Sequence, residues 1–176
     1  MLPSEIRLKF ERFSYTDNPC LALTENYVSI GADVDENDTT YHFIKVGKAK
    51  EAIRRCDNQR LKLIWGIKPQ RNAPNFCYRT LGYEELLMVI ANNLFGQSKP
   101  DYNMAGRTEC YGRFETPQDA MEGCWKIFEA FLVDEIEREE KLDINITAEP
   151  ILLNKKWADK ANSIFESVTK KLKLVA

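Results

Sequence analysis

The sequence predicts an α+β fold: a mainly antiparallel sheet with helices packed on one face and long helices near the C-terminus. Two observations favour this class. Segments in which apolar and polar residues alternate lie mostly in the first 70 residues, whereas the longest segment with helical periodicity begins after residue 115. Strands that follow one another, with long helices after them, are typical of α+β domains rather than of alternating α/β folds.

Alternation of apolar and polar residues predicts the strands. In residues 4–13, Ile6, Leu8 and Phe10 alternate with charged residues, so one face of this strand is expected to contact water. The predicted strands cover residues 4–13, 20–31 (a hairpin around Glu25–Asn26), 41–46, 61–67, 102–114 and 144–147.

Helical periodicity predicts four helices, the clearest of them over residues 116–143. Thr116 is a preferred N-cap residue, Pro117 suits the first helical position, and Asp119 adds negative charge to the first turn. The apolar stripe that should face the core comprises Met121, Cys124, Trp125, Phe128, Phe131, Leu132 and Ile136. The other predicted helices cover residues 48–56, 83–96 and 155–175.

Length and composition indicate a globular chain. We predict a domain over residues 1–143 and a C-terminal helical extension over residues 144–176 that packs on it. The hydrophobic share of 44% and the charged share of 30% are typical of folded proteins, so the chain should build a core without a metal.

The cysteines and the apolar runs indicate the compartment. Five cysteines at irregular spacing include no CxxC pair, which predicts reduced thiols and no disulfides. No apolar run has the length of a signal peptide or a membrane span. We therefore expect a cytoplasmic protein without a membrane partner.

Motifs for metals, cofactors and catalysis are missing from the sequence. The acidic loop that begins at Asp33 has Asp38 and Ile44 where a calcium-binding EF-hand needs Gly and a bidentate Glu. His42 is the only histidine, so a site with several histidines is excluded. There is no Gly-rich phosphate-binding motif and no nucleophile elbow. We expect no cofactor and a non-enzymatic protein.

Two alternatives stay open at this point. The first is a small enzyme or anion-binding protein, in which Cys110 or Cys77 acts with His42, or Arg107 and Arg113 line a pocket. The second is a homo-oligomer that forms through an apolar stripe on the C-terminal helix, with these contact residues: Trp157, Phe165 and Leu172.

Residues 106–128 resemble the strand-to-helix step of the RNA-recognition motif family. These residues stand at matching positions of the strand motif: Arg107, Cys110, Tyr111 and Phe114. Glu109, however, replaces a base-stacking aromatic residue. The family's partner motif is not found near the N-terminus. The resemblance therefore implies a β–α step rather than RNA binding.

Positive charge is concentrated in one segment of an acidic chain. Residues 45–79, hereafter the basic segment, contain ten Lys or Arg and two acids, although the net charge of the chain is −2. Four aromatic residues are interleaved with or adjacent to it, as in proteins that stack single-stranded bases: Tyr41, Trp65, Phe76 and Tyr78. The alternative interpretation is that the acidic part of the long helix, residues 129–143, pairs with this segment inside the fold.

The predicted function is the binding of an anionic macromolecule, either an acidic protein surface or nucleic acid. The binding face would carry the following residues: Lys48, Lys50, Arg54, Arg55, Arg60, Lys62, Lys68 and Arg71.

Overall fold

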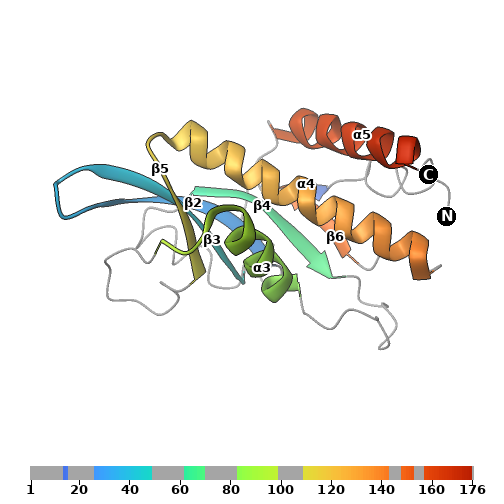
Figure 1. Ribbon diagram of the computed structural model, residues 1–176, viewed down its shortest axis with the longest axis horizontal. Helices are drawn as coiled ribbons and strands as arrows, with labels where there is room; N and C mark the ends of the chain where they lie inside the picture. The colour runs from blue at the N-terminus through green and yellow to red at the C-terminus, as the bar shows by residue number, and fades with distance from the viewer. Residues whose placement is uncertain are drawn as a thin grey trace.

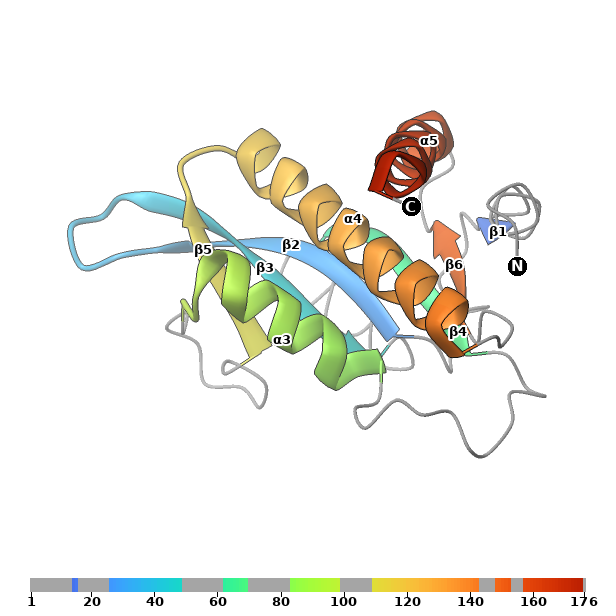
Figure 2. The same cartoon turned by 45° about the vertical axis from the view of Figure 1, so that its right-hand side comes forward.

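Six strands form one sheet in the computed structural model, which describes residues 14–15, 26–48, 62–69, 83–98, 109–142, 148–152 and 157–175. The strands are β1 (Ser14–Tyr15), β2 (Asn26–Val34), β3 (Thr40–Lys48), β4 (Lys62–Pro69), β5 (Cys110–Phe114) and β6 (Ala148–Leu152), and the helices are α3 (Tyr83–Phe95), α4 (Pro117–Leu142) and α5 (Ala158–Val175). Helices α3 and α4 cover one face of the sheet, and α5 packs against α4 (Figure 1, Figure 2). The predicted α+β class is confirmed.

The strand order is β1-β6-β4-β2-β3-β5. β2 and β3 form a hairpin whose register pairs Val28 with Val46 and Val34 with Thr40. Neighbouring strands in the described part of the sheet are antiparallel, except for β1 and β6, which are parallel. β6 lies between β1 and β4, so the chain beyond residue 143 contributes a strand to the same sheet.

The core lies between one face of the sheet and the apolar stripe of α4. Val28, Ile44 and Trp65, from three adjacent strands, are fully buried there. The indole Nε1 of Trp65 donates a hydrogen bond to the carbonyl oxygen of Cys124 (3.1 Å), and its ring meets that of Phe128 edge-on, with the centroids 5.2 Å apart. The predicted stripe of α4 is confirmed, because Met121 is partly buried and these members are fully buried: Cys124, Trp125, Phe128, Phe131, Leu132 and Ile136.

The predicted helix ends are also present. The backbone N–H of Asp119 donates to Oγ1 of Thr116 (3.1 Å), which is the expected N-cap bond of α4. Gly96 follows the last residue of α3 with φ +73°, and its N–H donates to the carbonyl of Asn92 (2.9 Å). This left-handed position favours glycine, so Gly96 ends α3 as predicted.

Helix α5 uses its apolar face within the same chain. Trp157, which precedes the helix, meets Trp125 of α4 with ring centroids 6.3 Å apart, and Phe165 and Val168 are buried. The stripe proposed for an oligomer contact thus packs on α4. None of the helices in the ranges given above is long and apolar enough to cross a membrane.

Several predicted elements differ from the structure or lie outside it. The predicted acidic loop is shorter, because β2 continues to Val34 and β3 begins at Thr40. β6 begins just after the short strand expected over residues 144–147, because Glu149 and Pro150 hide its alternation. The predicted strand over 4–13, the first half of the hairpin over 20–31, the helix over 48–56 (except Lys48, which ends β3) and residues 144–147 lie outside the described residues.

Truncation of Phe128 tests the core. The ring is fully buried between Trp65 and Trp125, so Phe128→Ala should lower the free energy of unfolding by about 3–5 kcal/mol. The control Lys126→Ala removes an exposed side chain from the same helix and should change it by less than about 0.5 kcal/mol. Urea unfolding followed by tryptophan fluorescence measures both. A loss below about 1 kcal/mol for Phe128→Ala would mean that α4 is not seated on the sheet.

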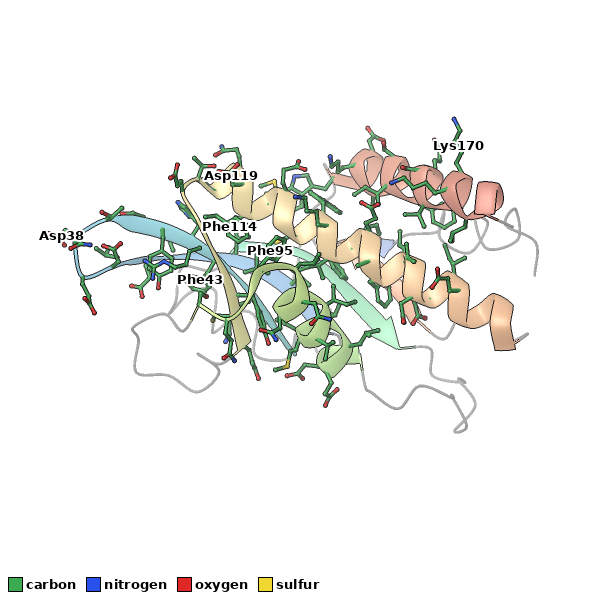
Figure 3. All side chains as sticks on the ribbon, viewed as in Figure 1. Asp38, Phe43, Phe95, Phe114, Asp119 and Lys170 are labelled. Carbon is green, nitrogen blue, oxygen red and sulfur yellow. The ribbon has the colours of Figure 1, made fainter. Side chains whose placement is uncertain are left out.

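Two glycines with nearly equal backbone angles offer a matched comparison. Gly96 (φ +73°) and Gly112 (φ +75°) are joined by a hydrogen bond from the N–H of Gly112 to the carbonyl of Gly96. A Cβ at Gly96 would meet open space, so Gly96→Ala should cost only the backbone strain, about 1–2 kcal/mol. A Cβ at Gly112 would clash with the ring of Phe114, which itself packs edge-on against Phe95 (Figure 3). Gly112→Ala should therefore destabilise the protein more; equal losses in urea unfolding would contradict this packing.

Candidate functional site

The sheet face opposite α3 and α4 carries a buried ion pair. The side chain of Lys45 on β3 is fully buried, and its Nζ lies 3.7 Å from Oε2 of Glu109, whose side chain is 22% exposed. Glu109 directly precedes β5, and Cys110, the first residue of β5, is the register partner of Lys45. Ser29 on β2 donates from its hydroxyl to the Lys45 carbonyl (3.4 Å). Three adjacent strands thus position this polar group.

The strand pattern explains why a lysine is buried here. Side chains alternate along a strand, so Lys45 shares a face with Tyr41 and Phe43, both of which are buried. The charge of a buried ammonium costs several kcal/mol unless an anion is near it, and Glu109 supplies that anion. The signal in the sequence that this face of β3 is covered is the pair of aromatic residues two and four positions before Lys45. Lys45, the first residue of the basic segment, is therefore not on the surface of the protein.

A second polar group lies near the turn of the β2–β3 hairpin. The guanidinium of Arg113 on β5 lies over the ring of Tyr41, 4.0 Å from the centroid, and donates to Oδ2 of Asp35 (3.4 Å). The Tyr41 hydroxyl donates to Oδ2 of Asp33 (3.4 Å). Burial, together with the Asp33 carboxylate, raises the pKa of Tyr41. The phenol therefore stays protonated and acts as a hydrogen-bond donor.

A tyrosine and a cysteine that follow Glu109 on β5 are also buried. Burial and the neighbouring Glu109 carboxylate raise the pKa of Tyr111 to about 12. Its ring lies in the main core, so it is not exposed for base stacking as in an RNA-recognition motif. Cys110 is fully buried in a small cluster with Tyr41 and Phe43.

The structure does not bring Cys110 and His42 together. His42 alternates with Tyr41 and Phe43 on β3, so it points to the other face of the sheet from the cluster that contains Cys110. Burial raises the pKa of the Cys124 thiol well above its ordinary value, which disfavours the nucleophilic thiolate. Cys77 and Arg107, the other residues of the enzyme alternative, lie outside the described residues. Within the ranges that the structure describes, no three His, Cys, Asp or Glu side chains form a group that could hold a metal ion.

Three of the eight predicted binding residues lie on described strands. Lys48 ends β3 opposite Asn26, and Lys68 lies one residue beyond the partner of Asn26 on β4. The backbones of Lys48 and Lys68 thus lie at the same end of the sheet, about two strand spacings or 10 Å apart. Lys62 pairs with Ile30, four residues farther along β2, and belongs to another part of the sheet. The side chains of these three lysines are outside the described part of the structure, as are the other predicted binding residues: Lys50, Arg54, Arg55, Arg60 and Arg71.

Two acids of α4 have cationic partners on α5. Oε1 of Glu122 lies 3.6 Å from Nζ of Lys160, and Oε1 of Glu129 lies 3.5 Å from Nζ of Lys171. Both pairs are largely exposed, so each contributes little to stability, but they show that these two carboxylates are directed toward α5.

Comparisons of the chain with protein-family models, curated proteins and solved structures gave no match.

A double-mutant cycle tests the buried ion pair. Glu109→Gln leaves the fully buried Lys45 cation without this carboxylate and should cost about 3–5 kcal/mol of unfolding free energy. Lys45→Met should cost less, because the Glu109 carboxylate can turn to water. In the double variant the losses should fall short of their sum by at least about 1 kcal/mol. Additive losses in urea unfolding would show that the two charges do not interact.

Proposed function

We propose that the protein is a non-enzymatic binding protein that holds an anionic macromolecule on its basic segment, and that an acidic protein surface is the favoured partner. The observation that carries this proposal is the pairing of α4 acids with α5. The acidic part of α4, from residue 129 on, was the internal complement that the sequence offered to the basic segment. Glu129, the first acid of this part, instead meets Lys171, and Glu122 nearer the start of the helix meets Lys160; both lysines lie far outside the basic segment in the sequence. These pairs direct two carboxylates of α4 toward α5, which favours an external partner for the basic segment.

The burial of one lysine and two aromatic residues indicates which class of partner the basic segment would bind. Lys45 is withdrawn from the surface, yet nine other Lys or Arg remain in the segment against two acids. Trp65 and Tyr41 are buried, so only Phe76 and Tyr78 of the four interleaved aromatic residues are left for base stacking. Single-strand binders depend on exposed aromatic side chains. The loss of two of them favours an acidic protein surface over single-stranded nucleic acid.

Charge reversal within the basic segment tests the proposal. Arg54→Glu with Arg55→Glu should weaken binding to polyglutamate at least about ten-fold at low salt, because attraction is replaced by repulsion. The matched control is Lys126→Glu with Lys170→Glu, which changes the net charge by the same amount at exposed positions on α4 and α5. Lys170 is labelled on α5 in Figure 3. The control should bind about as well as the original protein. Fluorescence anisotropy with labelled polyglutamate, in about 50 and 200 mM salt, measures both.

The same experiment separates the two partner classes. A single-stranded oligonucleotide of about 20 bases should bind more weakly than polyglutamate at equal salt. If nucleic acid is the partner instead, it should bind more tightly, with a slope of log affinity against log salt near −3 for about four to five phosphate contacts. Absence of binding to either probe at low salt, or equal binding by the two double variants, would contradict the proposal. Marked destabilisation of the Arg54/Arg55 variant would show that these arginines pair inside the fold.

A further inference from the structure

The far half of the β2–β3 hairpin, residues 31–41, projects beyond the rest of the sheet. Among the described pairings, β4 accompanies β2 only as far as Ile30, and β5 accompanies β3 only as far as His42. Figure 1 and Figure 2 show β2 and β3 extending together beyond the other strands. Figure 3 labels Asp38 at the tip of this hairpin. We call residues 31–41 the arm.

Hydrogen bonds at the turn determine which backbone groups face outward. The N–H of Asp35 donates to the carbonyl of Thr39 (3.0 Å), so the backbone of Asp35 faces β3. Backbone direction alternates along an antiparallel strand, which turns the N–H and C=O of Ala32 and Val34 to the outer edge of β2. Oδ1 of Asp33 accepts the Val34 N–H (2.8 Å). Within the described residues, the N–H of Ala32 and the carbonyls of Ala32 and Val34 then remain to pair with an added strand.

The arm is exposed at this edge and held in shape. The side chains of Ala32 and Val34 are exposed, Val34 to 47%. Oδ1 of Asp35 accepts the N–H groups of Asn37 and Thr39 (both 2.9 Å), while its Oδ2 lies 3.4 Å from the guanidinium of Arg113 on β5. A ribbon that is already ordered loses little conformational entropy when it binds, so the edge is preorganised.

We propose that the Ala32–Val34 edge docks an extended Lys- or Arg-rich segment of a partner protein, which adds to the arm as a third strand. Its residues are not part of the basic segment, although Lys62 of that segment pairs with Ile30, two residues before Ala32 on the same edge of β2. Backbone pairing supplies affinity in this mode of recognition, and charge selects the partner. The arm carries four carboxylates and no Lys or Arg, which favours a cationic segment. It also disfavours a second copy of the arm, because two such edges would bring like charges together.

The probe is a labelled peptide of about eight residues that alternates Lys and Val, tested against the full chain by fluorescence anisotropy. Ala32→Pro removes the outward N–H without removing a bond within the hairpin and should weaken binding at least about five-fold. The control Ala32→Ser keeps that N–H and should bind normally. Glu36→Gln with Asp38→Asn should weaken binding about three- to ten-fold at low salt, and less at about 200 mM.

A second probe does not depend on how the variants fold. The same peptide with N-methyl groups on alternate residues cannot pair along one edge, so it should bind the original protein at least about five-fold more weakly. Equal binding of the methylated and unmethylated peptides would overturn strand addition and indicate charge attraction alone. No binding of the Lys–Val peptide, or equally tight binding of a Glu–Val peptide, would overturn the cationic partner. Self-association of the protein that Ala32→Pro abolishes would show that a second copy is the occupant instead.

Discussion

The seating of α4 on Trp65 is the contact on which the rest of the structure depends. Trp65 is fully buried at the centre of the sheet and binds α4 through both its ring and its Nε1 hydrogen bond to Cys124. This contact fixes the rotation of the helix about its axis. With the apolar stripe turned to the sheet, Trp125 is presented to Trp157, and Glu122 and Glu129 are directed at α5. Packing in the core thereby decides where these two carboxylates lie.

The same rotation links the fold to the proposed function. An acidic helix that faced the basic segment would neutralise it within one molecule. Here two of its acids face lysines of α5 instead, which supports the proposal that the basic segment binds an external partner. The arm carries four carboxylates on β2 and in the turn. Concentrations of both signs along the sequence thus add up to a net charge of only −2.

Local signals in the sequence predicted the parts of the fold that depend on neighbouring residues. The α4 stripe and its Thr116 cap follow from a period of 3.6 residues and from orphan N–H groups, both of which are visible in a short window. The strand order could not be predicted, because the pairing of β6 with β4 joins residues some 80 positions apart and depends on no local pattern. The burial of Lys45 was missed for a related reason. Its charge indicated the surface, while the carboxylate that makes burial possible, Glu109, lies on a distant strand end. The stacking of Arg113 on Tyr41 also joins two strands, β5 and β3, that lie far apart in the sequence.

The central claim is that the two α4 acids that pair with α5 do not shield the basic segment, and neutralising them tests it most directly. Glu122→Gln with Glu129→Gln removes both carboxylates that pair with α5. At about 150 mM salt, where exposed charges more than about 8 Å apart are largely screened, the affinity for polyglutamate should stay within about two-fold of the original. Isothermal titration calorimetry on both proteins makes the comparison. An affinity that rises about ten-fold or more would show that these carboxylates were shielding the basic segment, and would contradict the account.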